Sequence, residues 1–275
     1  PRNNHRKKTS MPKTKTETIV YPVHHGLYVN LTNRCSCACT FCIRQTADGV
    51  GQDGEGGENN LWLDHEPDFD EVMAAFEAQD MSRYEEVVFC GYGEPTCAFD
   101  LLKRVAAEVK RRWELPVRVN TNGQGSLICG RNIAPEFEGI VDTVSISLNT
   151  PNAEEYAAIV RSQFGDKAFP AMLDFAREVR KYVPNVVMTT VETTISHEDE
   201  AACQRICDDL GVRYRIRAWV NSYRPQPPPA IPTTEPSNPD RFLQNSSKSC
   251  AARPGAAARL YHLFTFSLQM KALDG

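Results

Sequence analysis

The chain has 275 residues, of which 41% are hydrophobic and 24% are charged, a composition typical of globular proteins. Its formal net charge of −4 at pH 7 argues against the basic surface that broad nucleic-acid binding requires. The sequence contains no run of about 18 apolar residues, so a membrane-spanning helix is not expected.

Short β-rich runs alternate with helical patterns from about residue 27 to residue 217. The β-rich runs are 27–31, 86–90, 117–120, 142–148, 186–192 and 212–217. The helical patterns, with apolar residues spaced three and four apart, lie near 68–79, 100–112, 153–160, 168–182 and 198–210. This alternation predicts an α/β fold with parallel strands.

Six β/α units are too few for a closed eight-stranded barrel, so we expect a partial (β/α)6 TIM-like barrel that is open on one side. Crossover connections between parallel strands are right-handed, which places the carboxyl ends of all six strands on one rim. Chemistry in barrels of this kind gathers at that rim.

Three segments fall outside the repeating pattern. Residues 1–18 are basic and lack the apolar stretch of a secretory signal, so we expect a disordered leader. Residues 47–60 are rich in glycine and predict a loop, either an inert insertion or a functional element. Residues 222–275 begin with a proline-rich stretch that excludes a helix or central strand, and we expect a disordered tail. The core domain is therefore predicted to cover residues 19–221.

Four of the ten cysteines fall within eight residues, directly after the first predicted strand. Cys35, Cys39 and Cys42 have the spacing C-x3-C-x2-C, which provides three thiolates for a [4Fe–4S] cluster and leaves the fourth iron without a protein ligand. A zinc site would usually need a second ligand pair, and none with that spacing is present. Cys37, inside the triplet, is interpreted as a bystander rather than an alternative ligand. Dense thiols of this kind indicate metal binding in a reducing compartment, and we expect a cytoplasmic protein.

A second motif follows the second predicted strand. Gly91-Tyr92-Gly93-Glu94-Pro95 is a turn whose glycines allow the backbone to approach a ligand closely. Polar residues also end the third and fourth strands, at Asn122 and at Ser147 and Asn149. On its own, the 91–95 motif is better explained as an ordinary strand-to-helix turn, and the polar residues at the strand ends are equally well explained as surface turns.

The cysteine triplet, with Phe41 before its last member, and the 91–95 turn together resemble the radical S-adenosylmethionine (SAM) superfamily. The resemblance extends to the TatD-associated radical SAM proteins, which are named for a genomic link to TatD-type hydrolases. That finer match is carried by residues 28–35, 39–44, 48–51, 61–67 and 91–96, whereas the glycine-rich loop and the proline-rich tail depart from it.

The resemblance implies a [4Fe–4S] cluster and SAM as cofactors, and an electron donor such as a flavodoxin or ferredoxin. Cys35, Cys39 and Cys42 would bind the cluster. The implied SAM-binding residues are Phe41, Gly91, Tyr92, Gly93, Glu94, Asn122, Ser147, Asn149 and Arg161. Reductive cleavage of SAM would give a 5′-deoxyadenosyl radical that abstracts hydrogen from an unknown substrate. Residues that could face this substrate are Arg44, Asp48, His65, Glu192 and Arg217.

Three alternatives remain open from the sequence. A glycyl-radical activase and a deazaguanine-type synthase share the cysteine motif. A non-catalytic iron–sulfur or zinc-binding module belongs to a different class, and it would not need the Gly-x-Gly-Glu-Pro turn.

Overall fold

Seven strands form a single sheet in a computed structural model that describes residues 19–42 and 61–217. The strands are β1 (Val20–Val23), β2 (Gly26–Val29), β3 (Glu86–Phe89), β4 (Val117–Thr121), β5 (Thr143–Ser147), β6 (Asn185–Val191) and β7 (Arg213–Arg217). They lie side by side in chain order, and β2 through β7 pair in parallel. The two outer strands do not pair with each other, so the predicted partial barrel, open on one side, is confirmed for the described residues.

The sequence did not predict β1. This strand pairs antiparallel with β2 through a tight hairpin in which His24 has a φ of 51°. Pro22 lies within it, and proline is tolerated in a sheet only where its missing N–H is not needed, as on an outer strand.

Helices follow the strands in the expected order. They are α2 (Phe69–Glu77), α3 (Phe99–Trp113), α4 (Gly125–Cys129), α5 (Ala153–Val160), α6 (Ala168–Val179) and α7 (His197–Leu210). Asp68 caps α2 by accepting a hydrogen bond from the backbone N–H of Glu71. The five-residue α4 is the one described α-helix that the sequence did not predict. None of the helices within the described ranges is both long enough and apolar enough to cross a membrane.

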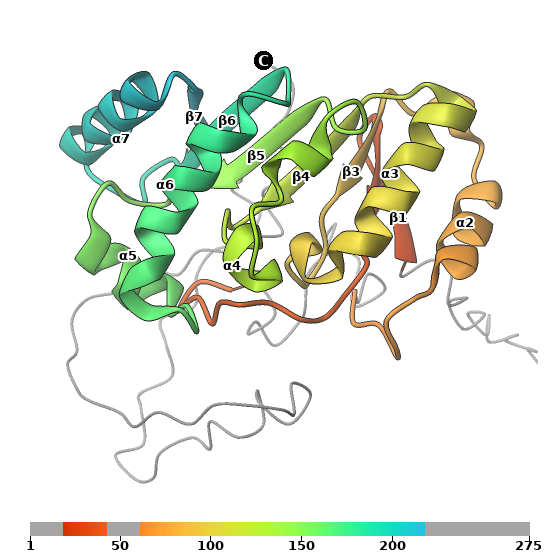
Figure 1. Cartoon of the computed structure of the whole chain (residues 1–275), viewed down its shortest axis with the longest axis horizontal. Helices are drawn as coiled ribbons and strands as arrows, with labels where there is room; N and C mark the ends of the chain where they lie inside the picture. Colours follow the sequence, from red (N-terminus) through yellow and green to blue (C-terminus); the bar gives the residue numbers. More distant parts are fainter. Residues whose placement is uncertain (1–18, 43–60, 218–275) are drawn as a thin grey trace, which may run out of the picture.

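The helices lie on one face of the sheet, as Figure 1 shows for α3, α4 and α6. Side chains on neighbouring strand positions point to opposite faces, so each strand presents two different surfaces. Apolar residues such as Val87, Phe89 and Ile146 point toward the helices and form the main core with them. The alternate positions on the inner face include polar and charged residues such as Arg118 and Ser145, together with a small apolar cluster of Tyr28, Val88 and Cys90.

Several sequence predictions concern residues outside the described ranges. These are the leader 1–18, the loop 47–60, the tail 222–275, and the residues Arg44 and Asp48. The predicted core domain of 19–221 is described as far as Arg217.

Candidate active site

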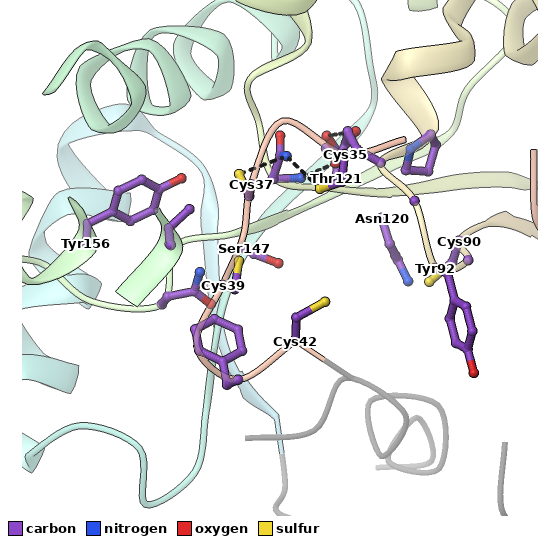
Figure 2. Close-up of a pocket in the computed structure, with 18 residues that line it drawn as sticks. Cys35, Cys37, Cys39, Cys42, Cys90, Tyr92, Asn120, Thr121, Ser147 and Tyr156 are labelled. Carbon is purple, nitrogen blue, oxygen red and sulfur yellow. Dashed lines mark hydrogen bonds between the residues drawn. The ribbon is translucent and has the colours of Figure 1, made fainter. Parts of the chain in front are cut away.

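The cysteine loop leaves β2 and crosses the rim where the parallel strands end. Cys35, Cys39 and Cys42 are half-buried, and all three are free thiols, as is the buried Cys37. All four line one pocket, and Figure 2 shows them distributed along the loop. Because the loop has no regular secondary structure of its own, its shape depends on its neighbours.

Backbone hydrogen bonds attach one side of the cysteine loop to the end of α5. The Thr40 amide donates to the Ile159 carbonyl at 2.8 Å, and the Gln163 amide donates to the Ser36 carbonyl at 2.9 Å. Between them, the Ala38 amide donates to the Arg161 carbonyl at 3.2 Å. The turn after α5 therefore fixes the middle of the cysteine triplet.

The 91–95 turn holds the other side of the loop. The Glu94 amide donates to the Arg34 carbonyl at 2.8 Å. A Cβ atom added to Gly93 would lie 2.2 Å from the Thr32 carbonyl oxygen, and one added to Gly91 would lie 2.1 Å from the side-chain oxygen of Asn30. Both glycines are therefore required for the turn to pack against the cysteine loop. The sequence had suggested a different role for them, which is to let the backbone approach a ligand closely.

The Glu94 carboxylate joins the turn to β4. It accepts hydrogen bonds from the Thr121 hydroxyl at 2.6 Å, the Asn122 amide at 2.8 Å and the Thr96 hydroxyl at 2.7 Å. Burial raises the pKa of Glu94, and these hydrogen bonds act in the opposite direction by stabilising the ionised form. The carboxylate is saturated by the protein, so its role in the structure is to position the turn and Asn122.

Gln124 is a buried hydrogen-bonding centre that the sequence analysis missed. Its side-chain oxygen accepts from the hydroxyls of Ser36 at 2.9 Å and Ser162 at 2.7 Å. Its side-chain nitrogen donates to the Cys37 sulfur at 3.3 Å and to the Tyr156 hydroxyl at 3.2 Å. One fully buried amide thus links the cysteine loop to Tyr156 within α5 and to Ser162 just after that helix. In the sequence, the feature that could have pointed to Gln124 was its position two residues after Asn122, which was predicted to bind SAM.

The segment 61–67 buttresses the start of the cysteine loop from outside. Arg34 forms a bidentate ion pair with Glu66, with nitrogen–oxygen distances of 2.6 and 2.8 Å. Asn33 donates to the Leu63 carbonyl at 2.8 Å and accepts from the Leu63 amide at 3.1 Å. The planar, bidentate ion pair between Arg34 and Glu66 restricts the conformation of Arg34, the residue immediately before Cys35.

The cysteine loop, the 91–95 turn and the strand ends border an open pocket of about 670 Å³, a volume that includes space continuous with solvent. Its lining residues are Cys35, Cys37, Cys39, Phe41, Cys42, Cys90, Gly91, Tyr92, Gly93, Glu94, Pro95, Asn120, Thr121, Asn122, Ser147, Asn149, Tyr156 and Val160. Figure 2 shows the labelled cysteines together with Asn120, Thr121 and Ser147, which line the same pocket.

The predicted site residues are brought together here with one exception. Phe41, Gly91, Tyr92, Gly93, Glu94, Asn122, Ser147, Asn149 and the three cysteines all line the pocket. Arg161 does not: it ends α5 with a φ of 49°, and its exposed side chain is absent from the lining. The binding roles of all these residues stay predictions.

The residues predicted to face a substrate are more scattered. His65 forms an exposed contact with Glu71 at 2.8 Å. Glu192 is exposed after β6, and its backbone amide donates to the Arg217 carbonyl at 2.8 Å. Arg217 ends β7 and is buried.

The donor set fits an iron–sulfur cluster. The three predicted ligands, Cys35, Cys39 and Cys42, are free thiols that line one pocket together with Cys37 and Cys90, and thiolates are the usual ligands of such clusters. Within the described residues, no three histidine, cysteine or acidic side chains converge as ligands of one metal ion would. A cubane does not require that convergence, because each thiolate binds a separate iron.

The sequence model of the radical SAM superfamily matches residues 29–218. Among curated proteins, the chain is 24% identical over 192 residues to a tungsten-containing aldehyde ferredoxin oxidoreductase cofactor-modifying protein of Pyrococcus furiosus, covering 68% of this chain and 49% of that protein. It is 27% identical over 197 residues to GTP 3′,8-cyclase 2 of Mycobacterium bovis, covering 70% of this chain and 50% of the cyclase. The chain therefore spans about half the length of these relatives.

Solved structures share the fold at low sequence identity. Streptococcus suis SuiB, bound to its precursor peptide SuiA, superposes with a TM-score of 0.53 at 15% identity, covering 74% of this chain and 41% of SuiB. A radical SAM methyltransferase from Sphaerobacter thermophilus gives a TM-score of 0.50 at 18% identity, covering 75% of this chain and 60% of the methyltransferase. These similarities establish the partial-barrel fold.

Proposed function

Because this chain belongs to the radical SAM superfamily, we propose that it cleaves SAM reductively at a [4Fe–4S] cluster and uses the resulting radical to take hydrogen from a substrate. Superfamily membership implies both cofactors. The observation that carries the proposal is the single pocket shared by the three cysteines, the 91–95 turn and the ends of β4 and β5.

We assign different roles to the cysteines and to the 91–95 turn. Cys35, Cys39 and Cys42 would hold the cluster and leave one iron open to SAM. The backbone carbonyls of the 91–95 turn would accept hydrogen bonds from the amino group of SAM. This assignment is supported by the turn's place in the pocket lining and by its rigid attachment to the cysteine loop.

The remaining polar groups would orient the rest of SAM. Asn122, Ser147 and Asn149 lie at the ends of β4 and β5, where they could contact the ribose or the carboxylate. Phe41 and Tyr92 offer apolar surface that would exclude water. Arg161 remains our candidate for the carboxylate, a role that requires its side chain to turn toward the pocket from its place at the end of α5.

Anaerobic reconstitution of the full chain tests the proposal directly. We expect about four irons and four sulfides per chain, and formation of 5′-deoxyadenosine from SAM in the presence of dithionite. Cys39→Ala should abolish iron binding and SAM cleavage together.

Cys203→Ala is the matched control, because Cys203 is a fully buried thiol on α7 outside the pocket lining. It should keep the iron and the activity of the parent. Stable zinc without iron uptake, or iron retained in Cys39→Ala, would contradict the assignment.

We further propose a place among the TatD-associated radical SAM proteins, with a functional link to a TatD-type hydrolase. The motifs at 28–35, 61–67 and 91–96 support this, and the 61–67 segment contacts the cysteine loop directly. We also propose a flavodoxin or ferredoxin as electron donor and a cytoplasmic location. Free thiols at all nine cysteines of the described ranges are consistent with a reducing compartment.

A further inference from the structure

Three arginines occupy the inner face of the sheet, on the side opposite the helices. Arg118 lies on β4, and Arg215 and Arg217 lie two positions apart on β7, so both point to the same face. Although β4 and β7 are not neighbours, Arg118 is near enough to repel Arg215 electrostatically. The curvature of the sheet thus gathers positive charge inside the partial barrel.

Two of these arginines are buried, the third, Arg215, is half-buried, and they have few hydrogen-bond partners among the described residues. Arg118 and Arg217 are each 7% exposed. Arg118 donates through Nη2 to the Glu86 carboxylate at 2.7 Å and to the Tyr28 hydroxyl at 3.2 Å. Among the described residues, the buried Nε atoms of all three arginines, and also Nη2 of Arg217, have no hydrogen-bond partner. One carboxylate in contact therefore faces three cations.

Arg217 is the most extreme of the three. Burial, reinforced by Arg215, lowers the pKa of Arg217 to about 9, so the guanidinium is still charged at neutral pH. Removing a charge from water without pairing it is among the most costly events in folding. A buried, charged and unpaired fork of N–H donors is what a binding site for a carboxylate or phosphate provides before its ligand arrives.

The position of Arg217 connects this cluster to the pocket described above. Arg217 is the last residue of β7 and so lies at the same rim as the pocket. It interacts electrostatically with Cys90, which lines the pocket. Asn120 also lines the pocket, and its buried side-chain oxygen has no partner among the described residues. A ligand extending past Cys90 and Asn120 would reach the arginines.

We propose that Arg217, together with Arg215 and Arg118, binds an anionic group of the substrate, a carboxylate or a phosphate, on the inner face of the sheet. This inference rests on the proposed function, because it places the anion beside the site where SAM would be cleaved. The substrate class is thus an anionic molecule whose reacting carbon would lie between the arginines and the cysteine loop.

Binding of simple anions tests the proposal without turnover. The full reconstituted chain is titrated with inorganic phosphate and, separately, with succinate, at an ionic strength held constant with sodium chloride. Affinity is measured by calorimetry and by the rise in melting temperature, with and without SAM. We expect the parent to bind at least one of the two anions and Arg217→Gln to bind it at least tenfold more weakly.

Arg205→Gln is the matched control, because Arg205 is an exposed arginine on α7. It should bind the anion as the parent does. Without ligand, Arg217→Gln should melt no lower than the parent, because the substitution removes a buried charge that has no ion-pair partner within the described ranges. That result separates loss of a binding site from loss of the fold.

Three outcomes would overturn the proposal. The parent could bind neither anion, or Arg217→Gln could bind as tightly as the parent. Alternatively, Arg217→Gln could lose affinity for SAM by tenfold or more, which would make Arg217 the partner of the SAM carboxylate. None of these readouts depends on SAM cleavage, so absence of 5′-deoxyadenosine would refute the proposed function while leaving the anion site to be judged by binding.

Discussion

Replacing Gly93 with alanine should loosen the cysteine loop from the 91–95 turn. The added methyl would lie 2.2 Å from the Thr32 carbonyl oxygen and 2.6 Å from the Arg34 carbonyl oxygen, and both are backbone atoms that cannot rotate away. Overpacking of this kind costs about 1–3 kcal/mol. Losing the hydrogen bond from the Glu94 amide to Arg34 adds about 1 kcal/mol. The free energy of unfolding should therefore fall by about 2–4 kcal/mol.

Thermal unfolding of the cluster-free protein, followed by circular dichroism, measures this cost. For a domain of this size, 1 kcal/mol corresponds to a shift of about 2–4 °C in the melting temperature, so we expect a fall of about 4–16 °C. Gly139→Ala is the control: Gly139 has a φ of 74° and no neighbour within 4 Å, so only backbone strain of about 1–2 kcal/mol applies. If Gly93→Ala melted above this control, steric packing would not explain the glycine.

Three further substitutions test other parts of the site. Arg161→Ala should retain the absorbance of the cluster but bind SAM about tenfold to a hundredfold more weakly, the effect of losing a contact worth about 1.5–3 kcal/mol; unchanged SAM affinity measured by calorimetry would remove Arg161 from the site. Gln124→Leu leaves the Ser36 and Ser162 hydroxyls without their acceptor, so urea denaturation should show a fall of about 2–4 kcal/mol in the free energy of unfolding. The reconstituted protein should also release iron faster to a chelator. Iron retention equal to that of the parent would mean that the Gln124 amide does not stabilise the cysteine loop. Asp68→Ala removes the cap of α2, which is not part of the pocket lining, and should cost about 1 kcal/mol in the same denaturation assay with iron content unchanged.

The order of strands and helices was readable from the sequence because each element carries its own local pattern. The predicted helix at 153–160 coincides with α5, whose cap at Asn152 and apolar positions are all local features. The hairpin strand β1 was missed because its place in the sheet depends on pairing with β2 across a turn, and Pro22 argues against a strand when read alone. The short α4 has too few residues for periodicity to appear.

The same distinction explains which site residues were found. The cysteine triplet and the 91–95 turn are contiguous motifs, so their joint presence in one pocket followed from their places after β2 and β3. Gln124 and Tyr156 meet only because two separate β/α units fold together, and no spacing in the sequence encodes that contact. The proximity of Arg118 to Arg215 likewise arises from curvature across strands that are not neighbours. Arg161 was placed from family position alone, which located its backbone beside the loop but not its side chain.

The separation of helix-facing and inner-face positions along the strands, clearest in β4 and β5, has a consequence for how such a protein can diverge. The residues that stabilise the fold, such as Val119 and Ile146, point toward the helices, whereas Asn120 and Ser145, adjacent to them in the chain, point away. Mutations on the inner face can therefore change the molecule that is recognised with little loss of helix–sheet packing. A lineage could exchange one substrate for another by single steps through folded intermediates, with the cysteine loop kept intact throughout.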